Sequence, residues 1–213
     1  MPSSDVVYGL KTVPHTSVTL SNLTGEQIAR TVNQYYRQFW QEALHTKGMR
    51  DYFDNEPIFD SSFTTSVVRL AIIAASQYLG FGALNEHRYV SPQGDVRKID
   101  VIWRSTPPTP SKPNQKARDI DSKEIILLAE IEMAGNVKQA VERLREYDQM
   151  LRSQGLQELW KLIVTYVPAN EIRPILSALP SGDFKWLIIT DDPQGRGAEF
   201  FGEPGNPGQI LPW

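Results

Sequence analysis

The stretch ILLAEIEMAGN, residues 126–136, joins an apolar run to two acidic residues, and it decides how the whole chain is interpreted. The apolar run predicts a buried strand over 124–133. Because side chains alternate across a strand, Glu130 and Glu132 lie on one face, together with Leu128. Two carboxylates in such a place cost free energy unless a partner cation, a shared proton or a metal ion compensates for them.

Asp100 brings a third carboxylate from the preceding β-prone run. Residues 96–103 predict a strand that contains Asp100, and Gly94-Asp95 predicts a hairpin turn before it. The hairpin can place this strand beside 124–133, so that the three acids lie on adjacent strands. Such an oxygen-rich pocket suits Mg²⁺ or Mn²⁺. These ions activate water and neutralise phosphate charge during hydrolysis.

The remaining segments alternate between helical and β-prone patterns. Helical spacing predicts helices over 24–46, 62–84, 137–153 and 170–179, and apolar runs predict strands over 160–167 and 184–190. This order predicts an α/β fold, a mixed central sheet flanked by helices on both faces. The helix over 137–153 is expected to carry Lys138, Arg143 and Arg145 on the face opposite its apolar stripe.

The segments outside these elements divide the chain. Residues 1–23 are predicted to form an N-terminal arm, 24–190 a single domain and 191–213 an irregular C-terminal tail. The proline-rich, locally basic segment 104–122 predicts a long surface loop.

Composition excludes several classes of protein. The 213 residues, 40% of them hydrophobic, are enough for one sizeable core. A formal net charge of −3 excludes a strongly basic, histone-like binder of nucleic acids, although it leaves room for a local basic face. The absence of cysteine excludes disulfides, thiolate zinc sites and cysteine nucleophiles. No apolar run predicts a secretory signal or a membrane span, so a cytoplasmic protein is expected.

The acidic residues resemble the active-site motif of the PD-(D/E)XK nuclease superfamily, which has a restriction-endonuclease-like core. That motif is an Asp on one strand, then Asp or Glu, any residue, and Lys on the next. Asp100 matches the first acid and Glu130 the second, whereas Glu132 stands where Lys is usual. The segment EIEMAGN, 130–136, is similar to the Glu-x-Glu variant of BamHI-type restriction enzymes. The resemblance covers roughly 86–190.

The resemblance implies a function and a set of roles. It implies a Mg²⁺- or Mn²⁺-dependent endonuclease that cleaves double-stranded DNA, a type II restriction enzyme or related defence nuclease working as a homodimer. Asp100 and Glu130 would ligate the metal, with the carbonyl of Ile131 as a further ligand. Glu132 would orient or deprotonate the attacking water.

Two more residues are candidates by the same resemblance. Lys138, one turn into the following helix, is a candidate for the cation that the motif lacks. Glu86, which follows the predicted buried helix, is a candidate for an additional upstream metal ligand, and an ordinary helix-end carboxylate is the alternative for it.

Other interpretations stay open. Glu130 and Glu132 could be salt-bridged to Lys or Arg on an edge strand. Because the motif Lys is absent, the chain could also be a catalytically inactive nuclease-fold protein that binds nucleic acid or a protein partner. A glycosidase acid pair is compatible with a separation of about 7 Å between same-face strand positions. However, no cluster of sugar-stacking aromatic residues surrounds the two glutamates.

Overall fold

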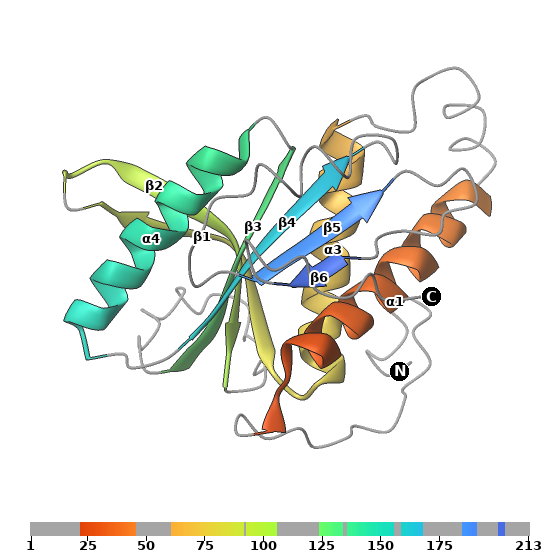
Figure 1. The fold of residues 1–213 in the computed structure, drawn as a ribbon, viewed down its shortest axis with the longest axis horizontal. Helices are drawn as coiled ribbons and strands as arrows, with labels where there is room; N and C mark the ends of the chain where they lie inside the picture. Colours follow the sequence, from red (N-terminus) through yellow and green to blue (C-terminus); the bar gives the residue numbers. More distant parts are fainter. Residues whose placement is uncertain are drawn as a thin grey trace, which may run out of the picture.

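The computed structural model describes residues 22–45, 61–91, 93–105, 124–133, 136–155, 159–167, 185–190 and 200–202 (Figure 1). Helices α1 (Gly25–His45) and α3 (Ser61–Tyr78) come first, followed by the strands β1 (Gly82–Val90), β2 (Val96–Arg104) and β3 (Ile125–Met133). Helix α4 (Val137–Ser153) then leads into β4 (Trp160–Val167), β5 (Lys185–Thr190) and β6 (Phe200–Gly202). None of the described helices is long and apolar enough to cross a membrane.

The strands form one mixed sheet in the order β1-β2-β3-β4-β5-β6. Neighbours are antiparallel from β1 to β3 and between β5 and β6, whereas β3, β4 and β5 are parallel. β3 therefore lies inside the sheet, paired on both sides, and its residues Ile125–Ile131 are all buried. Because α4 connects the parallel strands β3 and β4, it must cross over one face of the sheet.

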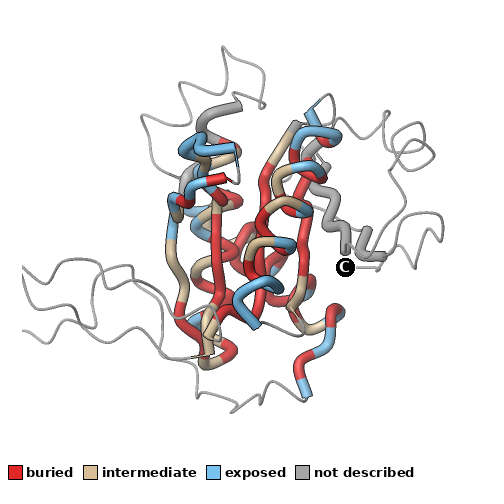
Figure 2. The backbone as a smooth tube through the Cα atoms, turned by 90° about the vertical axis from the view of Figure 1, so that its left-hand side faces the viewer, coloured by how far each residue is buried: buried red, intermediate tan, exposed pale blue. Residues whose placement is uncertain are grey.

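Helices cover both faces of the sheet, as the sequence pattern predicts (Figure 1). α1 and α3 pack on one face over a core that includes Trp103, Ala129 and Ile131. α4 packs on the other face over a second core that includes Leu128 and Ile163. Figure 2 shows the buried residues concentrated between the helices and the sheet. The predicted α/β class and mixed sheet are thus confirmed.

Two of the predicted boundaries are wrong. The helix predicted over 62–84 ends at Tyr78, because Gly80 adopts a φ of +90° and the amide of Phe81 donates to the carbonyl of Ser76. Within the predicted irregular tail, residues Phe200–Gly202 form β6 and pair with β5. The helix predicted over 170–179, residues 1–21 of the predicted arm and most of the loop 104–122 lie outside the described residues.

The β1–β2 hairpin changes direction at Asp100, and this change positions the candidate site. Ile99 packs in the core under α4, whereas Val101 packs in the core under α1 and α3. Pairing between β2 and β3 begins at Val101 and Ala129, while β1 and β2 stay paired out to the hairpin turn. From Asp100 to the turn, the hairpin is therefore no longer paired with β3, and it lies against α4 instead (Figure 1).

Candidate functional site

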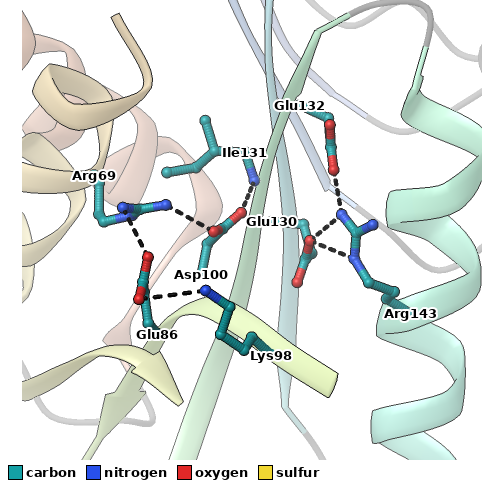
Figure 3. A network of polar contacts seen from close by, with 8 residues as sticks. All are labelled: Arg69, Glu86, Lys98, Asp100, Glu130, Ile131, Glu132 and Arg143. Carbon is teal, nitrogen blue, oxygen red and sulfur yellow. Dashed lines mark hydrogen bonds and ion pairs between the residues drawn. The ribbon is translucent and has the colours of Figure 1, made fainter. Parts of the chain in front are cut away.

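Asp100 lies at the point where β2 separates from β3. Its Oδ2 accepts a hydrogen bond from the backbone amide of Ile131 at 2.9 Å, and its Oδ1 accepts one from Nη2 of Arg69 at 2.9 Å (Figure 3). The carboxylate thus takes the place that a main-chain carbonyl would occupy if the two strands continued to pair. This arrangement fixes the Asp100 side chain beside β3.

Glu130 is the most deeply buried acid of the site. Its side chain on β3 is 1% exposed, and it points toward α4. Nε of Arg143 donates to Oε2 of Glu130 at 2.8 Å, and Nη2 of Arg143 donates to the same oxygen and to Oε1 of Glu132 (Figure 3). One guanidinium therefore pairs with both carboxylates that share this face of the strand.

The other carboxylate oxygen of Glu130 has no such partner. Oε1 of Glu130 is buried and forms no hydrogen bond with any described group. Burial, followed by the charge of Asp100, raises the pKa of Glu130 to about 8 even though Arg143 opposes the shift. Glu130 and Asp100 therefore interact electrostatically across the gap between β2 and β3. A proton or a cation at Oε1 would relieve the repulsion.

Arg143 stays protonated in this setting. Burial alone would disfavour its charge, but the carboxylates of Glu130 and Glu132 outweigh burial and raise the pKa of Arg143. A guanidinium with two carboxylate partners acts as a fixed positive charge and cannot serve as a base.

Glu86 joins the site on the α3 side. It lies opposite Asp100, between the β1–β2 pairs Asn85–Val101 and His87–Ile99. Its φ of +50° is rare for a residue other than glycine and marks a backbone held by its surroundings. Arg69 lies 3.4 Å from one oxygen of Glu86, and Lys98 lies 3.4 Å from the other (Figure 3). Arg69 thus connects Glu86 to Asp100.

The predicted site residues fall into two groups on either side of β3 (Figure 3). Glu86 and Asp100 lie with Arg69 and Lys98 on one side, and Glu130 and Glu132 lie with Arg143 on the α4 side. Within the described ranges, however, no three acidic or histidine side chains lie close enough to enclose a metal ion.

The expected cation is a different residue. Lys138 is exposed in the first turn of α4, and the residue beside the glutamates is Arg143, one to two turns further on. The prediction that Arg143 lies on the outer face of the helix is wrong, because it flanks the apolar stripe and reaches the sheet. The alternative that the two glutamates are salt-bridged is confirmed as to the ion pairs, because Arg143 pairs with both. Its edge-strand part is wrong, since β3 is an interior strand and the partner comes from a helix.

Arg69 was missed as a site residue. The only signal in the sequence is its position inside the apolar run of α3, where it is 20% exposed. A charged residue in such a run needs a partner, and the partners Asp100 and Glu86 lie 31 and 17 positions away along the chain.

No protein-family model, no curated protein and no solved structure matches the chain.

Proposed function

We propose that the chain is a metal-dependent endonuclease that hydrolyses phosphodiester bonds of double-stranded DNA, a type II restriction enzyme or related defence nuclease with a restriction-endonuclease-like core. One observation carries the proposal. Asp100 and Glu130 are close enough to interact electrostatically, and one oxygen of Glu130 is buried without a hydrogen-bond partner among the described groups. The mixed sheet, with α4 directly after the strand of Glu130, agrees with the resemblance to PD-(D/E)XK nucleases.

The donor set of the site fits a hard divalent cation. The groups around the gap are carboxylate oxygens of Asp100 and Glu130 and the backbone of Ile131, which are the ligand types that Mg²⁺ and Mn²⁺ prefer. The metal ion would compete with Arg69 for Asp100, because Arg69 donates a hydrogen bond to Oδ1 of Asp100. When bound, the ion would supply an activated water and would offset the charge that develops on the phosphate.

The chain's own residues have distinct tasks in this proposal. Glu132 is 19% exposed, in contrast to the fully buried Glu130, so it is the acid placed to orient water or accept its proton. Arg143 holds Oε2 of Glu130 and leaves Oε1 open. It also supplies the positive charge that the missing motif Lys would otherwise bring, and it stabilises the extra negative charge of the reacting phosphate.

Cleavage of supercoiled plasmid with Mg²⁺ or Mn²⁺ tests the proposal. We expect wild-type protein to nick or linearise the plasmid, and Asp100→Asn and Glu130→Gln to reduce the rate at least about 100-fold. Arg145→Gln is the matched control, because Arg145 is exposed on α4 away from the glutamates. No cleavage by the wild type, or equal cleavage by the two acid variants, would contradict the proposal.

Cleavage of both strands needs two sites or two encounters, so we propose that the enzyme acts as a homodimer. Sedimentation of the protein with and without duplex tests this. The proposal would be contradicted if the protein stayed monomeric with duplex and still converted supercoiled plasmid to linear product without a nicked intermediate.

A second candidate is a catalytically inactive protein on the same fold that binds nucleic acid or a protein partner. Arg143 and Arg69 favour it, because they form ion pairs with Glu130, Glu132 and Asp100 without a metal ion. The two candidates differ in one measurable way. DNA binding that is unaffected by EDTA and by Glu130→Gln, without any cleavage, would support the second candidate.

A further inference from the structure

The outer face of the β1–β2 hairpin carries a pair of exposed basic residues. Beyond the change of direction at Asp100, Tyr89 and Ile99 turn inward against α4. Their neighbours Arg88 and Lys98 turn outward and are exposed. The hairpin register places these two residues directly opposite one another.

Two like charges at directly opposite positions destabilise a strand pair. Lys98 is partly compensated by Glu86 at 3.4 Å. Within the described part of the chain, Arg88 has no ion-pair or hydrogen-bond partner. The positive charges of Arg88 and Lys98 therefore repel each other, and Arg88 has no acidic partner among the described residues to offset the repulsion. A bound anion would lower this repulsion.

The basic pair adjoins the candidate site along the same two strands. Arg88 and Lys98 are two residues along their strands from Glu86 and Asp100, which lie between the register pairs Asn85–Val101 and His87–Ile99. At about 3.3 Å per residue, the two pairs are separated by about 7 Å. Successive phosphates of one DNA strand rise by about 3.4 Å along the helix axis, and because the strand also winds around this axis they are farther apart than the rise. The spacing of about 7 Å therefore suits neighbouring phosphates, one at the acidic pair and the next near the basic pair.

We propose that the outer face of the β1–β2 hairpin binds the sugar–phosphate backbone of the DNA strand being cleaved, with Arg88 and Lys98 as phosphate ligands. This inference rests on the proposed nuclease function. The apolar end of the hairpin continues the same surface, where Val90 and Val96 are 59% and 68% exposed. These two valines pair across the strands and offer apolar contact to the sugars beyond the basic pair.

The opposite face of the hairpin provides an internal comparison. Arg97, next to Lys98, turns toward α4 and forms an ion pair with Glu146 at 3.2 Å. The charge of Arg97 is therefore already compensated by Glu146 within the fold. Arg30 on α1, paired with Glu26 at 2.7 Å, is a second basic residue whose partner is known. Removing Arg30 and Arg97 changes the net charge as much as removing Arg88 and Lys98.

The test is fluorescence anisotropy of a labelled, mixed-sequence 20-base-pair duplex, titrated with full-length protein over a series of salt concentrations. Ca²⁺ replaces Mg²⁺, because it accepts the same oxygen ligands, and a gel checks that the duplex stays intact. The variants are Arg88→Gln/Lys98→Gln and the control Arg30→Gln/Arg97→Gln, each shown by thermal melting to be folded.

We expect Arg88→Gln/Lys98→Gln to weaken binding at least about 10-fold and to reduce the slope of log K against log salt by about 2, one unit for each lost phosphate contact. The control variant should keep the wild-type slope. Equal affinity and slope in the two variants would overturn the inference and would fit a protein partner on this face. A wild type that does not bind the duplex at all would instead remove the proposed function on which the inference rests.

Discussion

Arg143 donates from its Nε to Oε2 of Glu130 at 2.8 Å, and its Nη2 bonds both Glu130 and Glu132. The guanidinium comes from α4, and the carboxylates come from the interior strand β3 that precedes it. This relationship explains how two acids can occupy a buried strand. It also leaves the second, buried oxygen of Glu130 without a hydrogen-bond partner among the described groups.

Loss of the Arg143 charge should destabilise the fold. Arg143→Gln removes the cation and the hydrogen-bond donors beside the buried Glu130. Because Glu130 can take up a proton in response, the change should cost about 1–3 kcal/mol, the penalty for a buried polar group left unsatisfied. Urea unfolding at pH 8.5, where Glu130 is largely ionised, measures the change. Arg145→Gln, on the exposed side of α4, should alter the free energy of unfolding by no more than about 1 kcal/mol, the upper range for an exposed interaction. Equal stability of the two variants would show that Arg143 does not balance the glutamates.

Asp100 should have separable structural and chemical roles. Asp100→Ala removes the acceptor of the Ile131 amide and should cost about 1–3 kcal/mol of unfolding free energy. Asp100→Asn keeps an oxygen that can accept this bond, so it should be the more stable variant although it loses the charge. Urea unfolding of both variants decides the matter, and Asn as destabilising as Ala would argue against the hydrogen bond to Ile131.

The raised pKa of Glu130 predicts a particular dependence of stability on pH. Its folded pKa of about 8 lies above the ordinary value of 4.5, so the folded state binds more protons between these pH values. The contribution of Glu130 to stability is therefore complete below pH 4.5 and is lost as pH rises through 8. Relative to Glu130→Gln, wild-type protein should lose up to about 4 kcal/mol across this window. Parallel curves for the two proteins would contradict a raised pKa.

The ion pair between α4 and β4 should depend on both partners. Lys161, which is 3% exposed, donates to Asp148 at 2.9 Å, and Asp148 also accepts from Arg152. Lys161→Met should cost about 3 kcal/mol, because it removes the buried cation beside Asp148. The double variant Lys161→Met/Asp148→Leu removes both charges and should be more stable than the single variant. Thermal or urea unfolding tests this, and a double variant less stable than Lys161→Met would contradict it.

Elements with a single strong periodic signal could be predicted from the sequence. The apolar stripe of α4 and the run of β4 gave both elements with the bounds that the structure shows. The end of α3 could not be predicted in this way, because apolar residues continue past Gly80 into β1. There the positive φ of Gly80 and the bond from Phe81 to Ser76 end the helix. β6 has too few residues to show a period.

The acidic residues of the site could be predicted, but their partners could not. Strand alternation placed Glu130 and Glu132 on one face, and the hairpin placed Asp100 near them. Arg143 and Arg69 reach the acids only after α4 and α3 pack on opposite faces of the sheet. The change of direction at Asp100 also depends on tertiary packing, since Ile99 and Val101 enter different cores.

Calorimetric titration of the protein with Mn²⁺ tests most directly whether Asp100 and Glu130 form a metal site. We expect saturable binding by the wild type, lost or at least about 10-fold weaker in both Asp100→Asn and Glu130→Gln and retained in Arg145→Gln. No binding by folded wild-type protein, or the same affinity in all four proteins, would contradict the metal site and with it the proposed nuclease.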